Sequence, residues 1–142
     1  MAEVMKLHYV VSGDDFTRAG ETSSKVKKTL NQLGFRPEVV RKVAIAMYEG
    51  EINMVIHADG GTIDVDISSD EIVIVMQDKG PGIPDVEKAM QEGFSTASNN
   101  VRELGFGAGM GLPNIKKYSD VMEIDTQVGK GTKLRIVIYA KE

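Results

Sequence analysis

Three short segments of this chain carry residue types suited to chemistry on a phosphorylated ligand. Glu49 and Asn53 stand four residues apart, so in a helix this acid and this amide would share one face. An Asp-Lys-Gly-Pro-Gly segment (78–82) follows an apolar run, and a later segment (105–112) has glycine at alternate positions. Such glycines let a backbone approach phosphate oxygens and turn its N–H groups toward them. Together the segments predict a nucleotide site with a metal ion and a base.

The acid and the amide predict two different roles. The Asn53 side chain offers a neutral oxygen, which suits Mg²⁺ that is already bound to phosphates. Glu49 is the candidate catalytic base, because a carboxylate can polarise the hydroxyl or water that attacks a γ-phosphate. Gly50 costs a helix about 1 kcal/mol relative to alanine, which indicates that another group approaches closely there. Taken alone, such a pair is more often a solvated helix face.

The alternating glycines lie immediately before a predicted helix. Helix N-termini bind anions through unpaired N–H groups and the macrodipole, so this segment predicts a cradle for a triphosphate. It matches neither the P-loop nor the dinucleotide fingerprint. A flexible hinge is the alternative. The residues of the candidate cradle are Gly105, Gly107, Gly109, Met110, Gly111 and Leu112.

A candidate base pocket is built around Asp78. A carboxylate at a strand end can accept a hydrogen bond from an exocyclic amine such as that of adenine. Gly80 and Gly82 would leave bare backbone for the base and the ribose, although Asp, Gly and Pro are also the usual residues of an ordinary turn. The Thr132 hydroxyl would support Asp78 directly or through water, or this residue simply serves the strand.

Composition limits the alternatives. A chain of 142 residues predicts a single domain, 1–142, and a net charge of −4 predicts no general attraction to nucleic acid or anionic membrane. The absence of cysteine excludes disulfides and thiolate metal sites, and no metal site is predicted through His8 or His57. Residues 1–4 do not begin a signal peptide and no apolar run approaches about 20 residues, so we expect a cytoplasmic protein.

The spacing of apolar residues predicts helices packed against a sheet. The expected fold class is α+β, a two-layer sandwich with helices on one face of a mixed, mainly antiparallel sheet. A mobile loop is expected over 93–106. The predicted strands are 3–11, 62–67, 71–77, 121–126 and 132–139, and the predicted helices are 16–33, 37–56, 84–91 and 110–118.

Taken in order, these segments resemble the Bergerat-type ATP-binding fold shared by gyrase, Hsp90, histidine kinases and MutL. Within that superfamily the chain is similar to the small anti-sigma-factor serine/threonine kinases of bacterial stress-response and sporulation switches. The likeness covers essentially the whole chain, including the cradle segment 107–112 and the Asn-Ile-Lys-Lys segment (114–117) that follows it.

The resemblance implies ATP and Mg²⁺ as ligands. Asn53 would hold the metal ion, Glu49 would be the catalytic base, and Asp78 with Thr132 would recognise adenine. The glycines would shape the base pocket and hold the phosphates, and residues 93–104 would form a lid. Within that lid the possible contacts to the γ-phosphate or a partner are Ser95, Thr96 and Arg102. Glu51 is an extra acid that we expect to point away from Glu49, because residues two apart face different sides of a helix.

The resemblance also implies a partner-switching pathway. Relatives phosphorylate a serine on a small antagonist protein of the STAS type, and some also bind a sigma factor. Some form homodimers, and the oligomeric state of this chain stays open. One alternative is a nucleotide-gated binding module that sequesters a sigma factor or another regulator with little catalysis. Another is the catalytic half of a split sensor histidine kinase, which would need a separate partner carrying the phosphoacceptor histidine.

Overall fold

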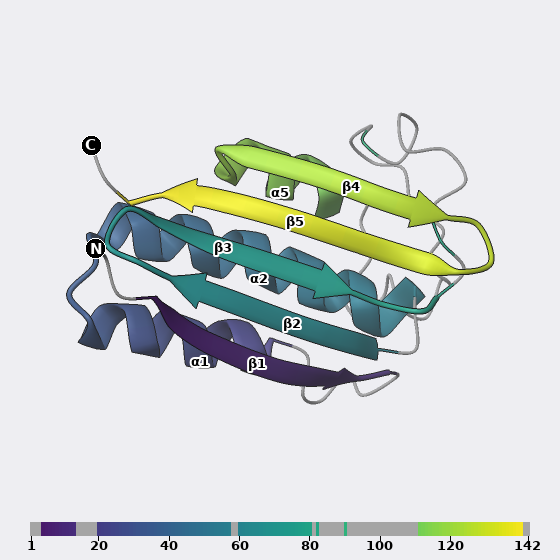
Figure 1. Cartoon of the computed structure of the whole chain (residues 1–142), viewed down its shortest axis with the longest axis horizontal. Coiled ribbons are helices and arrows are strands. Elements are labelled where there is room, and N and C mark those ends of the chain that lie inside the picture. Colours follow the sequence, from purple (N-terminus) through teal and green to yellow (C-terminus); the bar gives the residue numbers. More distant parts are fainter. Residues whose placement is uncertain are drawn as a thin grey trace, which may run out of the picture.

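Three helices cover one face of a five-stranded sheet in the computed structural model, which describes residues 4–13, 20–57, 60–80, 82, 90 and 111–140 (Figure 1). The predicted α+β two-layer class is therefore confirmed. The elements are β1 (Met5–Ser12), α1 (Glu21–Gln32), α2 (Pro37–His57), β2 (Gly60–Ile67), β3 (Glu71–Gln77), α5 (Gly111–Tyr118), β4 (Val121–Gln127) and β5 (Gly131–Tyr139).

The sheet has the order β1-β2-β3-β5-β4, and each of its four strand pairings is antiparallel. The central strand β3 lies between β2 and β5. A tight loop over 68–70 joins β2 to β3, where Ser68 and Glu71 exchange backbone and hydroxyl hydrogen bonds. A second hairpin joins β4 to β5, with Gln127 opposite Gly131. The predicted strands are all present, with ends displaced by a few residues.

Alternating residues of the strands face the helices and form the core. The buried side chains of the three central strands are branched or long apolar residues, which suit a pleated surface packed on one side. α2 lies along the middle of this surface, with α1 and α5 on either side (Figure 1). The buried residues that β2, β3 and β5 contribute to this core are Ile63, Val65, Ile67, Ile72, Ile74, Met76, Leu134, Ile136 and Ile138.

The helices start and end close to where the sequence places them. α2 begins with Pro37 in its first turn and runs to His57, which confirms the long helix. α1 begins at Glu21, whereas the predicted start falls in 14–19, outside the described residues. α1 ends before Gly34, whose φ of 83° is left-handed. The predicted helix over 84–91 and loop over 93–106 also lie outside the described residues, apart from Met90.

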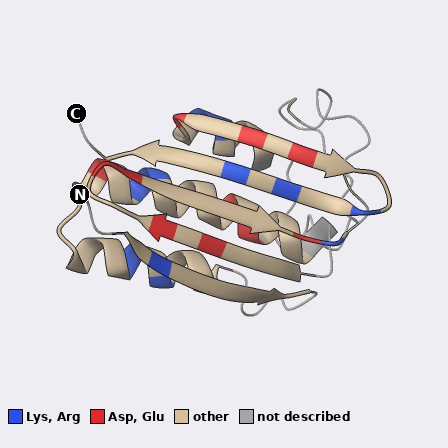
Figure 2. Ribbon diagram, in the orientation of Figure 1, with Lys and Arg blue, Asp and Glu red and all other residues tan. Residues whose placement is uncertain are grey.

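The sheet face away from the helices is striped with charge (Figure 2). Acidic residues on β2 and β4 alternate with basic residues on β1 and β5, and Arg135 pairs with Glu123 at 2.7 Å across the strands. Exposed pairs of this kind contribute little to stability, but they keep the face polar. In the part of the chain that the structure describes, no helix has the length and apolar character needed to cross a membrane.

One testable prediction concerns the β4–β5 hairpin. Gly131 has a φ of 130°, and a Cβ there would lie 2.1 Å from the backbone oxygen of Asp78. We expect Gly131→Ala to lower the free energy of unfolding by about 2 kcal/mol or more, because strain and a backbone clash add. Gly129→Ala is the matched control, since its φ of 81° is also left-handed but nothing lies within 4 Å. Urea unfolding of both variants measures the difference, and equal losses would contradict the close packing of Asp78 on the hairpin.

Candidate functional site

The middle of α2 lies close against the end of β3. Gly50 is buried, and a Cβ at this position would lie 2.2 Å from Sδ of Met76 and 3.9 Å from Cδ1 of Ile115. Met76 belongs to β3 and Ile115 to α5. The glycine that is costly in a helix is therefore explained by the Met76 side chain, and α2, β3 and α5 meet at this turn.

Glu49 lies beside this contact and faces α5. Its carboxylate is half-buried, and the side-chain amide of Asn114 donates a hydrogen bond of 3.3 Å to Oε1. Burial raises the pKa of the Glu49 carboxyl above its ordinary value, and the hydrogen bond from Asn114 offsets part of that rise. A carboxylate with a raised pKa is a better proton acceptor, which is the property that a general base needs.

Asn53 lies one turn beyond Glu49 on α2 and is also half-buried. Residues at this spacing are neighbours on a helix surface, so the predicted metal residue and the predicted base share one face of α2. The amide oxygen of Asn53 suits Mg²⁺, which is usually held by one or two protein oxygens together with phosphates and water.

Asp78 is held at the end of β3 by two backbone N–H groups, one from its own loop and one from β5. Its Oδ1 accepts hydrogen bonds from the backbone N–H of Gly80 at 2.9 Å and of Thr132 at 3.3 Å. The backbone of Thr132 thus supports Asp78, whereas the Thr132 hydroxyl, expected to do so, shares a 2.8 Å hydrogen bond with the hydroxyl of Thr126. These contacts orient the carboxylate without using Oδ2.

Glycines bring the Asp78 segment onto the β4–β5 hairpin. Gly82 has a φ of 79°, and a Cβ there would lie 2.5 Å from the backbone oxygen of Gln127. Gly131, at the start of β5, likewise brings the hairpin close to the backbone of Asp78. From the sequence, Gly82 was expected to leave its backbone open to a ligand. In the structure, the β4–β5 hairpin occupies the space that a Cβ of Gly82 would need.

A further close contact links the strand side of the site to the helix side. A Cβ on Gly61 would lie 2.6 Å from Cε of Met54 and 3.1 Å from Cα of Asp78. Met54 follows Asn53 on α2, so the predicted metal residue Asn53 and the predicted adenine-binding residue Asp78 lie at the same end of the sheet. Two segments of α2 and β3, more than 20 residues apart in sequence, therefore converge there.

Part of the predicted site lies outside the described residues. Gly111 begins α5 and Leu112 is half-buried in its first turn. The lid over 93–104 and its Ser95, Thr96 and Arg102 are not described. The same holds for the cradle residues Gly105, Gly107, Gly109 and Met110, and their role in holding phosphates stays a prediction.

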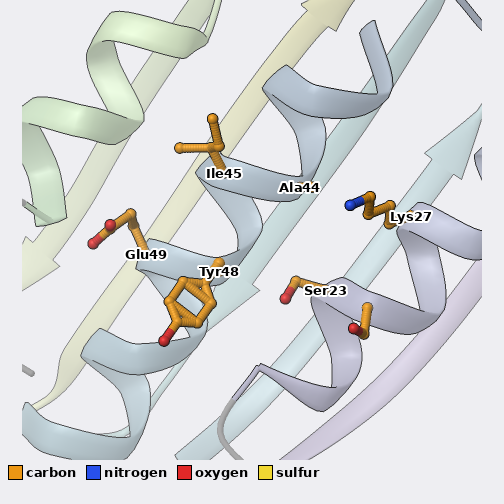
Figure 3. A pocket seen from close by; sticks show the side chains of 7 residues that line it. Ser23, Lys27, Ala44, Ile45, Tyr48 and Glu49 are labelled. Atoms are coloured by element: carbon orange, nitrogen blue, oxygen red, sulfur yellow. The ribbon is translucent and has the colours of Figure 1, made fainter. Parts of the chain in front are cut away.

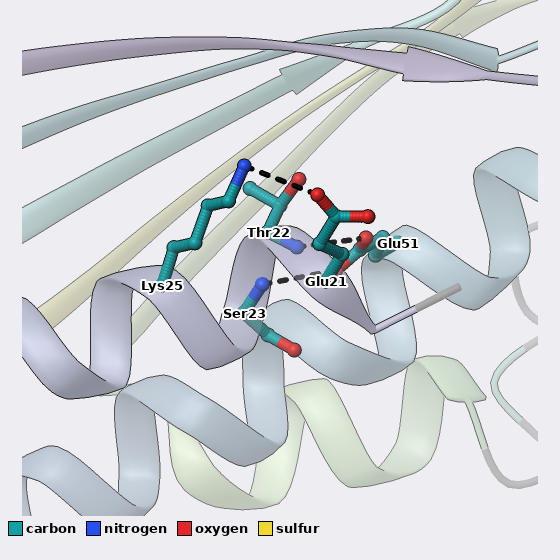
Figure 4. A network of polar contacts seen from close by, with 5 residues as sticks. All are labelled: Glu21, Thr22, Ser23, Lys25 and Glu51. Atoms are coloured by element: carbon teal, nitrogen blue, oxygen red, sulfur yellow. Dashed lines mark hydrogen bonds and ion pairs between the residues drawn. The ribbon is translucent and has the colours of Figure 1, made fainter. Parts of the chain in front are cut away.

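Glu51 has a role that the sequence did not show. Its side chain is 2% exposed, and its two carboxylate oxygens accept hydrogen bonds from the backbone N–H groups of Ser23 at 3.0 Å and Thr22 at 3.2 Å (Figure 4). Glu51 thus points to α1, as expected for a residue that does not share the site with Glu49. The partners lie 28 and 29 residues earlier, so local spacing gave no signal for them.

A shallow hollow of about 280 Å³ runs across the outer surface of α1 and α2. Figure 3 shows Ser23 and Lys27 on the α1 side, Tyr48 over α2, and Glu49 on the far side with its carboxylate turned toward α5. The candidate catalytic base is therefore one of the residues that line the hollow. Its lining residues are Ser23, Ser24, Lys27, Ala44, Ile45, Tyr48 and Glu49.

Comparison with known families decides the superfamily. Residues 39–142 match the family described as histidine kinase-, DNA gyrase B-, and HSP90-like ATPase. The chain belongs to this ATPase family. The match covers Glu49, Asn53, Asp78 and most of the chain, so the predicted superfamily is confirmed.

Individual relatives agree with the narrower resemblance. The serine/threonine-protein kinase RsbT of Bacillus subtilis (strain 168) is 30% identical over 131 residues, which span 89% of this chain and 90% of that relative. The anti-sigma F factor of Thermoanaerobacter sp. (strain X514) is 36% identical over 102 residues, 72% of this chain but only 64% of that relative. The suspected family of anti-sigma-factor kinases is thereby confirmed.

Solved structures support the fold of this ATPase. A Mycobacterium tuberculosis protein with RsbU and RsbW domains matches 97% of this chain and 33% of its own, with a TM-score of 0.65 and 13% identity. The mycobacterial sensor histidine kinase MprB matches 99% of both chains, with a TM-score of 0.53 and 17% identity. At these identities the likeness shows the shared fold alone.

The contact between Asn114 and Glu49 gives a prediction about proton affinity. Asn114→Leu removes a hydrogen bond that favours the charged carboxylate, and the apolar leucine still excludes water from the site. The pKa of Glu49 should therefore rise further. A ¹³C NMR titration of the Glu49 carboxyl carbon measures the change. The same substitution at the exposed Asn31 on α1 is the control and should leave that pKa in place. An unchanged or lower pKa in Asn114→Leu would show that the amide does not act on the base.

Proposed function

We propose that this chain is an ATP-dependent protein serine/threonine kinase that phosphorylates a STAS-type antagonist in a bacterial partner-switching pathway. The observation that carries the proposal is the half-buried Glu49, whose pKa is raised by burial, one turn from Asn53 and next to the end of the sheet that holds Asp78. The kinase and anti-sigma names of its relatives support the same conclusion.

The residues present fit MgATP. The Asp78 carboxylate is held at the strand end with Oδ1 used by backbone N–H groups, so Oδ2 would accept the adenine amine. The amide oxygen of Asn53 would be the protein ligand of Mg²⁺. When bound, this ion would neutralise charge on the β- and γ-phosphates. The glycines of the 105–111 segment would add backbone N–H groups around the phosphates.

Glu49 would supply the proton chemistry. The hydroxyl oxygen of the acceptor serine forms a bond to the γ-phosphorus, and the bond from that phosphorus to the bridging oxygen of ADP breaks. The hydroxyl proton passes to Glu49. Asn114 would keep the carboxylate in place through its hydrogen bond, which is the only one from α5 to this group among the described residues.

The partners follow from this proposal. The antagonist supplies the serine, and a sigma factor is a second candidate partner, since relatives carry the name anti-sigma F factor. This same name favours a second function, a nucleotide-gated module that sequesters a regulator with little catalysis. We further propose that residues 1–142 form a single domain and that the protein is located in the cytoplasm. A homodimer is one oligomeric state to be tested.

Replacing the base tests the kinase. Glu49→Gln should lower kcat for transfer from MgATP to a serine of a purified STAS-domain antagonist by about 10²–10⁴-fold, because the proton acceptor is lost. Affinity for MgATP, measured by calorimetry, should stay close to wild type. Glu38→Gln, an exposed acid in the first turn of the same helix, is the control and should be fully active.

The outcomes separate the two functions. Wild-type protein that binds MgATP tightly but transfers no phosphate to any STAS-domain protein from its organism would refute the kinase and favour the binding module. Phosphate on a histidine of a partner, labile to acid, would instead indicate a histidine kinase.

Adenine recognition is tested at Asp78. Asp78→Asn should weaken MgATP binding by about 10–100-fold, the effect of losing one hydrogen bond to a charged group. Asn keeps one oxygen for the N–H groups of Gly80 and Thr132, so the fold should survive. Asp125→Asn, exposed on β4, is the matched control for calorimetry. Equal affinity of Asp78→Asn and wild type would exclude Asp78 from the nucleotide pocket.

A further inference from the structure

Among the described residues, the side-chain cap of α1 comes from outside this helix. Its N-cap residue is Gly20, with a φ of 92° and no side-chain hydrogen bond to the first turn. The first N–H groups of a helix have no partner within the helix, and a side chain normally accepts from them. Here the N–H groups of Thr22 and Ser23 donate to Glu51 on α2 instead. The cap of α1 is therefore supplied by a neighbouring helix.

The hydrogen bonds from Thr22 and Ser23 to Glu51 tie α1 to α2. Glu51 is almost fully buried, and a buried carboxylate is costly unless hydrogen bonds and a positive charge or dipole compensate it. The two N–H groups and the positive end of the α1 macrodipole provide that compensation. A second contact reinforces it, since a Cβ on Gly20 would lie 3.2 Å from the ring of Tyr48. Exchange of Glu51 for a neutral residue would loosen the start of α1.

The start of α1 is also one side of the hollow that leads to Glu49. Ser23, whose N–H binds Glu51, lines this hollow together with Ser24 and Lys27. α2 provides the other side, from Ala44 to Glu49 (Figure 3). The distance between the two sides is therefore set where Glu51 joins the helices (Figure 4).

We propose that Glu51 is a positioning residue that fixes the α1 side of this hollow for the protein acceptor, so that its hydroxyl meets Glu49. The inference rests on the proposed kinase function. Glu51 acts through α1, whereas Asn53 and Asp78 on α2 and β3 serve the nucleotide. Loss of the Glu51 contact should therefore weaken use of the protein acceptor and spare use of ATP.

The experiment uses the full chain with Glu51→Gln, MgATP and the STAS-domain antagonist that the wild type phosphorylates. We expect KM for the antagonist to rise by about tenfold, with KM for ATP and kcat at saturating antagonist within about twofold of wild type. Amide hydrogen exchange at Thr22 and Ser23, followed by NMR, should accelerate, because their acceptor has lost its charge. Glu21→Gln is the matched control, since this half-buried acid lies at the start of the same helix and pairs with Lys25 instead; it should leave both KM values unchanged.

A second variant changes the α1 side of this contact, at the N-cap residue Gly20. Gly20→Ala strains a left-handed residue and crowds Tyr48, so it moves the start of α1 without removing the buried charge. It should raise KM for the antagonist as well, and it keeps the test valid if Glu51→Gln fails to fold. An unchanged antagonist KM in a folded variant of either kind, or a parallel loss of ATP affinity, would overturn the positioning role. A wild type that binds MgATP but phosphorylates no antagonist would refute the kinase itself and this inference with it.

Discussion

The close approach of α2 to the sheet at Gly50 is the constraint on which the rest of the structure depends. A Cβ there would force the end of the Met76 side chain to shift, so glycine lets the helix lie this near the end of β3 with Met76 in its present position. Since helix interiors disfavour glycine, the packing must offset a local cost of about 1 kcal/mol. The proximity places the turn that carries the acid and the amide over the strand end that carries Asp78.

From this turn, α2 uses different faces for different tasks. Glu49 turns to α5 and receives the Asn114 amide, whereas Glu51 turns to α1 and receives two backbone N–H groups. Asn53 continues along the face of Glu49. Two acids only two residues apart therefore have different roles. Burial raises the pKa of the half-buried Glu49, whereas the buried Glu51 links α2 to α1.

The sequence predicted the parts of the site that depend on local spacing. Strand alternation gave the sheet, the run from Pro37 gave α2, and the four-residue step from Glu49 to Asn53 gave a shared helix face. It missed contacts between distant segments. The hydroxyl of Thr132 was expected to support Asp78 directly or through water; in the structure it shares a hydrogen bond with Thr126, and the backbone N–H of Thr132 bonds to Asp78. The cost of Gly50 was noticed, yet nothing local could show that a methionine of β3 causes it.

The borrowed cap of α1 has a consequence for how the chain acquires its structure. A helix of 12 residues is marginal by itself in water, and the N-cap glycine of this one offers no side-chain acceptor. It can become ordered only once α2 exists to receive it. The order of α1 thus depends on one buried acid of α2, which holds the first turn of that helix through two hydrogen bonds.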